Sequence, residues 1–469
     1  MTLLAAGEGA FDVAVPVVIV GAGAAGLVAG LAAREAGAEV LVLERDAVPR
    51  GSTALSAGLI PAAGTSFQRL LGIEDSADRF AADIMAKAKG AADPDLVPLV
   101  THEIAPAVEW LHARHGLAFS VIHDFRYPGH GAYRMHGLQS RSGEELVNAL
   151  RAAAEAAGVE ILCGARVVDL LSDELGAVRG VQYERPDGTR EGVGCGTLIL
   201  ACNGYGGDKA LVARHIPEMA GALYFGHAGN QGDALRWGEA LGAATRHLSG
   251  YQGHGSVAHP AGILITWATL TEGGVQVNAA GERFANEALG YSEHAAAVLQ
   301  QADGIAWTVF DARIAGIARQ FVDFQNAEAS GAIVEAPDAE GLAARMRVPP
   351  AALAATLREV DCLKAEGATD AFGRTFAGVP PLVPPLLAVR VTGALFHTQG
   401  GLVVDRTARV TRTDGAPIAN LFAAGGAACG VSGPTAAGYL SGNGLLTAVA
   451  LGRVAGREAG RLAAATVAV

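Results

Sequence analysis

A short strand followed by a glycine-rich turn and a helix is the feature that most constrains this fold. Residues 17–20 form a continuous apolar run, and the next six residues read Gly-Ala-Gly-Ala-Ala-Gly, with glycine at positions 21, 23 and 26. An alanine-rich segment then predicts a helix to about residue 37, and a second apolar run over residues 40–43 ends on Glu44. This order of strand, glycines, helix, strand and terminal acid is typical of a dinucleotide-binding βαβ unit.

Each part of this unit has a physical role in such a site. Gly21 permits the tight turn, Gly23 lets the backbone approach a pyrophosphate, and Gly26 lets the helix pack on the strand. The free N–H groups at the start of the helix favour the negative charge of phosphates. Glu44 can accept hydrogen bonds from a ribose. The plain alternative is a glycine-rich turn that holds no ligand.

Composition disfavours several other classes of protein. The chain has 469 residues and a net charge of −12, which disfavours binding to nucleic acid or to an anionic membrane surface. Its five cysteines form no C-x-x-C pair, so we expect free thiols, no metal site and a cytoplasmic location. No lysine or arginine precedes Arg34, unlike the basic start of a signal peptide. The uncharged residues 421–452 are rich in glycine and contain Pro434, so we expect no membrane span.

The pattern of strands and helices predicts a discontinuous α/β domain interrupted by a second domain. Residues 1–245 hold the dinucleotide motif, and a turn at Pro186-Asp187-Gly188 predicts a small hairpin sheet packed beside it. Residues 246–385 are more polar, include a helical acidic segment from residue 338 to 363, and are interpreted as an inserted α+β capping domain. Residues 386–469 return to apolar strands and a final helix, which complete the Rossmann-like domain.

Five further blocks carry a resemblance to a known family. They are residues 197–204 (T-L-I-L-A-C-N-G), Gly232-Asp233, residues 277–287 (V-N-A-A-G-E-R-F-A-N-E), residues 397–401 (H-T-Q-G-G) and residues 441–444 (S-G-N-G). Together with the first motif they resemble the fumarate reductase and succinate dehydrogenase flavoprotein superfamily, which includes flavocytochrome c and the ketosteroid Δ1-dehydrogenases. The resemblance implies a Rossmann-like FAD-binding domain, a cap over the flavin, and hydride transfer between a substrate carbon and flavin N5.

The motif and the resemblance together predict how FAD is held. Membrane-bound members attach the flavin covalently to a histidine near the position of Gly51; the stretch here is Ser52-Thr53-Ala54, which implies non-covalent FAD. The chain has no C-x-x-C-H haem attachment motif, so we expect an external electron acceptor or donor. The predicted FAD-contacting residues are Gly21, Gly23, Ala24, Ala25, Gly26, Glu44, Arg45, Ser52, Thr53, Ser56, Ala57, Gly58, Val167, Ala201, Cys202, Asn203, Gly204, Asp233, Gly425, Gly426, Ser441, Gly442, Asn443 and Leu445.

The substrate positions depart from those of fumarate reductases. Those enzymes use arginines to bind a dicarboxylate and to deliver a proton, and the resemblance places Tyr291 and Tyr439 at the two arginine positions. It places Trp267 and Leu270 at the positions of the proton-relay glutamate and arginine. Burying a dicarboxylate without paired positive charge costs several kcal/mol, so these replacements argue against fumarate as the substrate.

The ketosteroid Δ1-dehydrogenases match this pattern more closely, because they place a tyrosine at the position of Tyr291. There the tyrosine removes a proton while hydride leaves the neighbouring carbon. An unperturbed tyrosine has a pKa of about 10, so a second hydroxyl or a histidine nearby must help form its phenolate, and Tyr127 is the candidate for that hydroxyl. The candidates for holding the carbonyl oxygen are Tyr439, His397 and the backbone around Gly438. His254 is a second histidine that the resemblance retains at the site, with His259 as a competing alignment.

The predicted function is FAD-dependent desaturation of a cyclic ketone, which introduces a C=C bond α,β to the ketone. Residues 429–434 are shorter than the tyrosine-bearing loop of the ketosteroid enzymes, which favours a smaller cyclic ketone or keto acid over a 3-ketosteroid. Two alternatives stay open: a fumarate-reductase-like reductase of an activated alkene such as an unsaturated acid, using reduced FAD, and a non-catalytic flavin-binding subunit. Tyr291 could also be a cap residue that only hydrogen-bonds to backbone.

Overall fold

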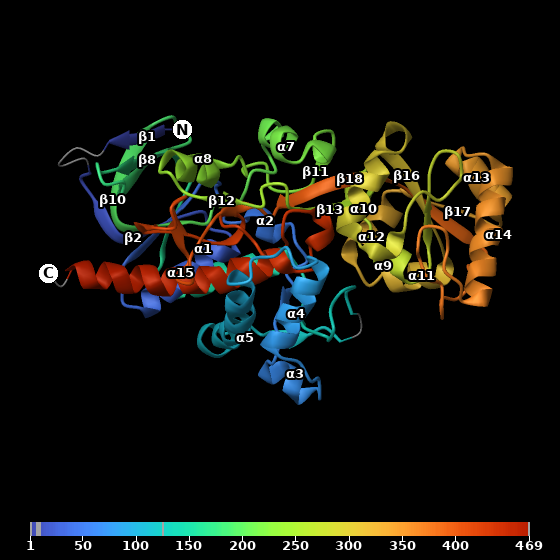
Figure 1. The fold of residues 1–469 in the computed structure, drawn as a ribbon, viewed down its shortest axis with the longest axis horizontal. Helices are drawn as coiled ribbons and strands as arrows, with labels where there is room; N and C mark the ends of the chain where they lie inside the picture. Colours follow the sequence, from blue (N-terminus) through green and yellow to red (C-terminus); the bar gives the residue numbers. More distant parts are fainter. Residues whose placement is uncertain (1, 6–10, 124–125, 468–469) are drawn as a thin grey trace. The chain divides into compact units, whose positions relative to one another are not determined.

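The computed structural model describes residues 2–5, 11–123 and 126–467 (Figure 1). These residues fall into two compact units. The first takes in the described residues up to Ile216, Gly226–Tyr251, and those from His397 onward. The second takes in Pro217–Phe225 and Gln252–Phe396. The second unit therefore extends past the expected end at residue 385, and it includes residues 217–225, which the sequence analysis assigned to the first domain.

Strand β2 (Ala14–Val20) lies inside the main sheet of the first unit. Among the described residues this sheet has the order β1-β8-β9-β10-β2-β3-β7, and β21 pairs with the end of β10. β2 is parallel to both of its neighbours, and its residues 17–20 are at most 5% exposed, as in sheets covered on both faces. The other strands are β1 (Thr2–Ala5), β3 (Val40–Glu44), β7 (Glu160–Cys163), β8 (Arg166–Ser172), β9 (Val178–Glu184), β10 (Arg190–Leu200), β20 (Arg409–Thr411) and β21 (Pro417–Ala423). The predicted α/β fold is confirmed.

The hairpin predicted near residue 186 is present, but it does not form a separate sheet. β9 and β10 are antiparallel and are joined by a turn in which Arg185 N donates to Thr189 O (2.8 Å). β10 is 11 residues long, so its first half pairs with β9 while its second half pairs with β2 and β21. One long strand therefore joins the hairpin to the parallel sheet.

Helix α1 (Ala24–Glu35) packs against the C-terminal helix α15 (Asn443–Val467) through glycines (Figure 1). A Cβ atom on Gly452 would lie 2.6 Å from the Ala25 carbonyl oxygen, and one on Gly456 would lie 2.1 Å from the Ala29 carbonyl oxygen. The two backbones approach this closely only because these side chains are missing. Within the described residues, neither α15 nor any other helix is long and apolar enough to cross a membrane.

The first unit contains seven more described α-helices. They are α2 (Gly51–Ala54), α3 (Ser66–Leu70), α4 (Ala77–Lys87), α5 (Leu96–His115), α6 (Gly143–Ala156), α7 (Lys209–His215) and α8 (Asp233–Ala240). Short strands complete it: β4 (Ile60–Pro61), β5 (Ser120–Val121), β6 (Met135–Gly137), β12 (Thr245–Arg246) and β19 (Gly401–Leu402).

The second unit is built on its own largely antiparallel sheet. Its described strands have the order β14-β13-β18-β16-β15, and β11 and β17 also pair with β18. Phe310, Phe324 and Phe376 are fully buried in its core. The strands are β11 (Leu223–Tyr224), β13 (Tyr251–Ala258), β14 (Ile263–Leu264), β15 (Val275–Val277), β16 (Ile305–Asp311), β17 (Ile333–Ala336) and β18 (Leu386–Thr398), and the first four helices are α9 (Ala268–Thr271), α10 (Tyr291–Leu299), α11 (Ala312–Ala318) and α12 (Val322–Ala329).

The acidic segment predicted as one helix is two helices, α13 (Ala339–Met346) and α14 (Pro350–Glu366). Arg347 ends α13 in the left-handed conformation, with φ of +58°. Pro350 then begins α14, where a missing N–H costs no helical hydrogen bond. The two helices are thus separated by a backbone turn that apolar spacing alone does not reveal.

Replacing Gly456 with alanine should destabilise the protein, because the new methyl group meets the Ala29 carbonyl oxygen. We expect the free energy of unfolding, measured by denaturant titration, to fall by about 1–3 kcal/mol, the usual cost of overpacking. Gly316 in α11 is the control, since a Cβ atom there meets nothing within 4 Å. Gly316→Ala should raise stability by about 0.5–1 kcal/mol. Equal effects of the two substitutions would contradict the packing argument.

Candidate active site

The glycine turn after β2 is so tight that it excludes side chains. Gly21 has a φ of +102°, and a Cβ atom there would lie 2.7 Å from the Ala201 carbonyl oxygen. A Cβ atom on Gly26 would lie 1.9 Å from the Gly21 carbonyl oxygen. Because β10 runs parallel to β2 with Leu200 opposite Val20, its end places Ala201 to Gly204 beside this turn. The structure therefore brings together two stretches that are far apart in sequence and were both predicted to contact FAD.

The predicted segment around α2 packs against the same turn. Thr53 Oγ1 accepts a hydrogen bond from Ala24 N at the start of α1 (2.9 Å). Ser52 Oγ accepts one from Asn203 Nδ2 (3.1 Å), and the predicted residues 56–58 follow directly. The start of α1, helix α2 and the end of β10 thus form a cradle of backbone N–H groups and small side chains, which suits phosphates and a ribityl chain.

Glu44, at the end of β3, directs its carboxylate at the glycine turn. Its Oε2 accepts a hydrogen bond from Ala22 N (2.8 Å) and its Oε1 accepts one from Asp46 N (2.9 Å). Burial raises the pKa of Glu44, and these N–H groups partly oppose that rise. Ala165 N donates to Glu44 O (2.8 Å), which brings the start of β8 and the predicted Val167 to this end of β3. The carboxylate keeps lone pairs that ribose hydroxyls could use.

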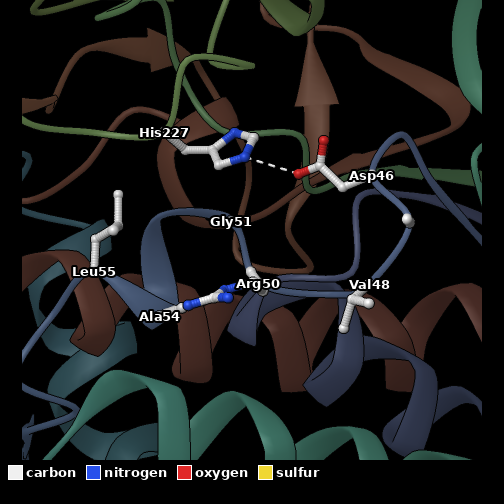
Figure 2. A pocket seen from close by; sticks show the side chains of 8 residues that line it. Asp46, Val48, Arg50, Gly51, Ala54, Leu55 and His227 are labelled. Carbon is white, nitrogen blue, oxygen red and sulfur yellow. Dashed lines mark ion pairs between the residues drawn. The ribbon is translucent and has the colours of Figure 1, made fainter.

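A pocket of about 450 Å³ lies over the loop that follows Glu44 (Figure 2). An ion pair between His227 Nε2 and Asp46 Oδ2 (2.7 Å) spans it. Arg45 Nη1 donates to Gly229 O (2.8 Å), so the predicted Arg45 side chain is engaged with backbone. The lining residues are Asp46, Ala47, Val48, Arg50, Gly51, Ala54, Leu55 and His227. The pocket therefore adjoins the loop on which a dinucleotide would rest.

The C-terminal residues predicted to contact FAD join the cradle. A Cβ atom on Gly426 would lie 2.1 Å from Asn203 Oδ1. Gly425 has a φ of +60°, and a Cβ atom there would lie 3.1 Å from the Ala25 side chain. Residues 441–445 lead into the first turn of α15. Residues 425–426 thus contact both the start of α1 and the segment that follows β10.

Two buried side-chain oxygens of the first unit make no hydrogen bond within the described protein, Asn443 Oδ1 and Asp233 Oδ1. Burial raises the pKa of Asp233. Buried polar atoms in folded proteins nearly always have a partner, so both atoms fit a ligand that offers N–H or hydroxyl donors, as FAD does. No group of three or more His, Cys, Asp or Glu side chains in the described ranges could hold a metal ion.

His397 and Tyr439 lie together in the first unit. Their rings meet edge to face at 5.5 Å between centroids. His397 Nδ1 lies 2.9 Å from Gln399 Nε2, and Ser432 Oγ donates to Gln399 Oε1 (2.6 Å). Asn443 Nδ2 in turn donates to Ser432 Oγ (2.9 Å), so one chain of contacts links a predicted substrate residue to a predicted FAD residue. Burial lowers the pKa of His397 to about 4, which leaves the ring neutral.

Tyr291 and His254 form a second pair, inside an aromatic cluster of the second unit. Their rings stack at 4.9 Å between centroids with a 22° interplanar angle. Trp267 meets the His254 ring edge to face at 5.6 Å, and Phe396 stacks on it at 5.4 Å. Phe225 stacks on Phe396 at 4.8 Å. The structure therefore surrounds the predicted proton-transfer residue with aromatic rings.

Tyr127, the predicted supporting hydroxyl, belongs to the first unit and is half-buried.

The protonation state of His254 follows from its surroundings. Burial, with a smaller contribution from the charge of His294, lowers the pKa of His254 to about 3. Its Nδ1 accepts a hydrogen bond from Ser256 N (3.2 Å), and a backbone N–H can only donate. The neutral ring therefore carries its proton on Nε2, where it can donate to a carbonyl oxygen. The alternative residue, His259, is exposed.

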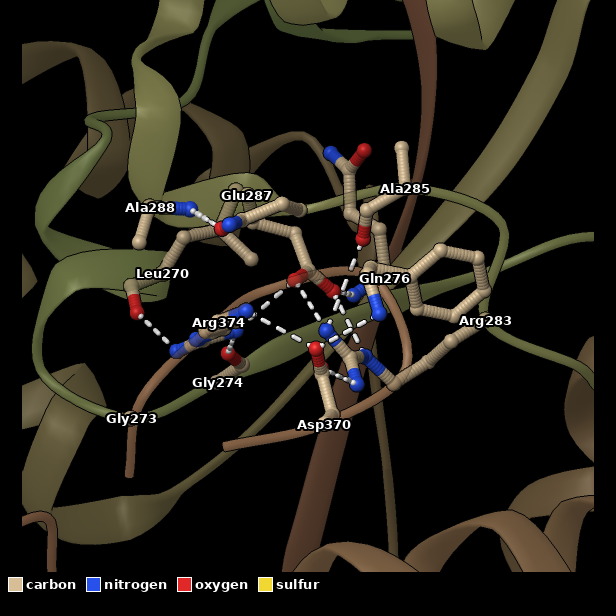
Figure 3. A network of polar contacts seen from close by, with 12 residues as sticks. Leu270, Gly273, Gly274, Gln276, Arg283, Ala285, Glu287, Ala288, Asp370 and Arg374 are labelled. Carbon is tan, nitrogen blue, oxygen red and sulfur yellow. Dashed lines mark hydrogen bonds and ion pairs between the residues drawn. The ribbon is translucent and has the colours of Figure 1, made fainter. Parts of the chain in front are cut away.

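A buried ion network is centred on Glu287, which lies shortly before Tyr291 in the chain (Figure 3). Glu287 Oε2 pairs with Arg283 Nη2 (2.6 Å) and Arg374 Nη1 (3.0 Å), and Arg283 also pairs with Asp370. Glu287 Oε1 accepts a hydrogen bond from Gln276 N (2.9 Å). Burial opposes ionisation of Glu287, but the hydrogen bonds and charges of the two arginines prevail and lower its pKa to about 2. The V-N-x-x-G-x-R-F-x-N-E string thus encodes a structural network.

This network fixes the backbone that presents Tyr291. Asn286 Oδ1 accepts a hydrogen bond from Ala288 N (2.9 Å) and caps the short turn Glu287–Leu289. Gly290 follows with a φ of +142°, a conformation that favours glycine, and Tyr291 then begins α10. The position of the tyrosine is therefore set by residues that the family motif places directly upstream.

The sequence analysis missed several residues of these clusters. Phe225 and Phe396 lie far apart in the chain and carry no local signal of their contact. His294 is three residues after Tyr291, and helical spacing could have indicated that both side chains lie on one face of α10. Gln399 stands inside the H-T-Q-G-G block, but its link to Ser432 depends on tertiary structure.

Replacing Glu287 with glutamine should destabilise the protein by about 3–5 kcal/mol at neutral pH, because two buried arginines then share one carboxylate. The pKa of Glu287 is lowered to about 2 from an ordinary 4.5. Its ionised form therefore stabilises the fold fully above about pH 4.5, and this stabilisation is lost as the pH falls towards 2. The difference in unfolding free energy between wild type and Glu287→Gln should therefore shrink over this range. Glu272→Gln, at a half-exposed pair with Arg313, should cost less than about 1 kcal/mol. A difference that does not change with pH would contradict the assignment.

Comparison with known proteins identifies the family. A family model described as an FAD binding domain matches residues 16–445. A probable fumarate reductase of Shewanella frigidimarina (strain NCIMB 400) is 31% identical over 451 residues, which cover 95% of this chain and 74% of that protein. A 4-oxocyclohexanecarboxylate 2-dehydrogenase of Sinomonas cyclohexanicum is 27% identical over 526 residues, covering 90% of this chain and 88% of that protein.

Solved structures agree with this assignment. The open conformation of a flavocytochrome c3 fumarate reductase superposes with a TM-score of 0.83 at 29% identity, covering 97% of this chain and 80% of that one. A 3-ketosteroid-Δ4-(5α)-dehydrogenase of Rhodococcus jostii RHA1 superposes with a TM-score of 0.77 at 25% identity, covering 98% and 100%. The predicted resemblance is confirmed: the chain belongs to the FAD-binding flavoprotein family of the fumarate reductases, and it is an FAD-dependent oxidoreductase acting on CH–CH bonds.

Proposed function

We propose that this chain reduces a C=C bond conjugated with a carbonyl group, in a substrate that is not a dicarboxylate, with FAD held non-covalently. The observation that carries the proposal is the stacking of Tyr291 on a neutral, buried His254. This direction is the one that the sequence analysis kept as its alternative, behind desaturation of a cyclic ketone. The 31% identity to a protein named as a probable fumarate reductase now supports reduction.

The side chains of the second unit suit the reductive direction. A phenol hydroxyl is a proton donor, so the hydroxyl of Tyr291 can give its proton to the α-carbon. To act as a base the same hydroxyl would need positive charge to favour its anion, and the ring stacked on it, His254, is neutral. His254 Nε2–H donates to the carbonyl oxygen and stabilises the negative charge that develops there. Reduced FAD, when bound, supplies the hydride for the β-carbon.

The charges of the second unit argue against a dicarboxylate. Arg283 and Arg374, both largely buried, pair with Glu287 and Asp370, so their charge is already balanced. Tyrosines stand where the resemblance to fumarate reductases places the substrate arginines. An alkene activated by a ketone or by a single carboxyl group fits this set of residues better than fumarate does.

Desaturation of a cyclic ketone is the second candidate, and the relative named 4-oxocyclohexanecarboxylate 2-dehydrogenase favours it. The same residues would act in the opposite order. Tyr291 would take the α-proton while His254 holds the carbonyl oxygen. This direction requires a group that promotes ionisation of the tyrosine, which is the role predicted for Tyr127.

Anaerobic stopped-flow spectroscopy tests the proposal. We expect dithionite-reduced, FAD-loaded protein to be reoxidised by 2-cyclohexen-1-one faster than by fumarate. Tyr291→Phe should slow the reaction with the enone by about 10²–10⁴-fold, the usual contribution of a positioned acid, while FAD stays bound. Tyr183→Phe is the matched control, because Tyr183 donates to Glu191 in the hairpin of the first unit and should leave the rate unchanged.

Two outcomes would count against this function. Rapid reoxidation by fumarate and none by the enone would restore the dicarboxylate assignment. Bleaching of oxidised FAD by cyclohexanone, with no reoxidation by the enone, would establish desaturation as the preferred direction.

A further inference from the structure

Arg374 joins two separate segments of the second unit (Figure 3). Its Nη1 pairs with Glu287 Oε2 (3.0 Å) and donates to Gly274 O (2.9 Å), and its Nη2 donates to Leu270 O (2.9 Å). Arg374 is 3% exposed, so these contacts lie inside the unit. The guanidinium group therefore connects the ion network around Glu287 to the segment that contains Leu270 and Gly274.

Leu270 belongs to the short helix α9, which follows Trp267. Trp267 is the N-cap residue of this helix, and its carbonyl oxygen accepts hydrogen bonds from Leu270 N (2.9 Å) and Thr271 N (3.1 Å). Gly274 N donates to Thr269 O (3.1 Å) at the other end. A helix of four residues is not stable by itself, so its position depends on contacts from outside. Contacts of Arg374 at this end of α9 therefore also fix the backbone of Trp267.

Two more cations bind carbonyl oxygens of the same segment. Lys364 Nζ donates to Gly273 O (2.8 Å), and Arg313 Nη2 donates to the carbonyl oxygen of the preceding residue (2.6 Å). Positive charge suits this end of a helix. Within the described residues, Arg374 is the one of these three cations that also pairs with Glu287. It is therefore the side chain that joins the two segments.

Each segment carries one ring of the aromatic cluster. Trp267 meets the His254 ring at 5.6 Å and the Tyr291 ring at 6.3 Å between centroids. Tyr291 begins α10 shortly after the turn that Glu287 opens. The two rings thus reach His254 from elements that Arg374 links to each other.

We propose that Arg374 is a positioning residue, which sets Trp267 and Tyr291 relative to each other around His254. A guanidinium group holds its N–H donors in one rigid plane, whereas a lysine carries all of its donors on a single nitrogen. Arginine can therefore serve the Glu287 carboxylate and two carbonyl oxygens at once. The inference rests on the proposed function, in which Tyr291 gives the proton and His254 donates to the carbonyl oxygen.

Fluorine nuclear magnetic resonance of FAD-loaded protein labelled with 5-fluorotryptophan tests the link itself. The chain has four tryptophans, and Trp267→Phe assigns the Trp267 signal by its loss. Arg374→Lys keeps a positive charge beside Glu287 but offers one nitrogen to three acceptors, so the Trp267 signal should move or broaden. The signal of Trp307, in β16 of the same unit, is the internal reference that should stay in place.

Lys364→Met is the matched control, because it removes a buried cation from the same segment without touching Glu287. It should lower the free energy of unfolding and leave the Trp267 signal unchanged. A double variant, Glu287→Gln with Arg374→Gln, separates stability from position. It leaves Arg283 paired with Asp370, so no buried charge is unpaired, and it should be more stable than Glu287→Gln alone. Its Trp267 signal should still move, and it carries the test if Arg374→Lys does not fold.

Kinetics with 2-cyclohexen-1-one tests the positioning role. Arg374→Lys and the double variant should lower kcat by about ten- to a hundredfold with little change in KM, as misplacement of a reacting group does. Lys364→Met should keep the wild-type kcat.

The possible results are distinguishable. An unmoved Trp267 signal in the Arg374 variants, or an equal movement in Lys364→Met, would overturn the link whatever the kinetics. If the signal moves as expected but the wild type does not reduce the enone, the proposed function fails and the link stands. If the enone is reduced and the Arg374 variants keep the wild-type kcat, the positioning role is wrong.

Discussion

Close approach of backbone to backbone, possible only where side chains are missing, is the constraint on which the first unit depends. Gly21 and Gly26 let the turn after β2 close against the end of β10, and Gly452 and Gly456 let α15 lie on α1. The contact of Gly21 with Ala201 joins segments far apart in the sequence, and the contacts of α15 with α1 join the two ends of the first unit. Together they leave the N–H groups at the start of α1, the Glu44 carboxylate and the small residues of α2 facing one cradle. The positions of these glycines therefore shape the cradle in which FAD would bind.

In the second unit the main constraint is the pairing of buried charges. Its buried arginines, Arg283 and Arg374, form ion pairs with Glu287 and Asp370. This network shapes the turn after which Tyr291 begins α10. What faces Tyr291 is instead a neutral imidazole and an indole, and a phenyl ring stacks on that imidazole. Such surroundings suit a carbonyl compound, which needs hydrogen-bond donors and apolar walls, and they penalise a second carboxylate. The chain thus shares the fold of a flavocytochrome c3 fumarate reductase, while the proposed function assigns it a less charged substrate.

The features of the fold and the site that could be predicted from the sequence are those encoded by residues close together in the chain. The tight turn at Gly21, the acid at the end of β3 and the V-N-x-x-G-x-R-F-x-N-E string are each written in consecutive residues, so both the cofactor and the family could be inferred. Tyr291 could be singled out because it follows that string at a fixed distance. The stack of Phe225 on Phe396 could not be predicted, because it joins distant segments through tertiary packing. The ambiguity between His254 and His259 was one of alignment, and burial with aromatic contacts now favours His254. The break at Arg347 could have been predicted, because Pro349-Pro350 marks the start of a new helix even though the helical spacing of apolar residues continues across it.

The central claim is that this site binds a neutral carbonyl compound rather than a dicarboxylate. Titration of the oxidised, FAD-loaded protein with cyclohexanone and with succinate, followed by the flavin absorbance bands, measures both dissociation constants under identical conditions. The account predicts tighter binding of cyclohexanone, by about tenfold or more, which corresponds to about 1.4 kcal/mol. Tighter binding of succinate would contradict it.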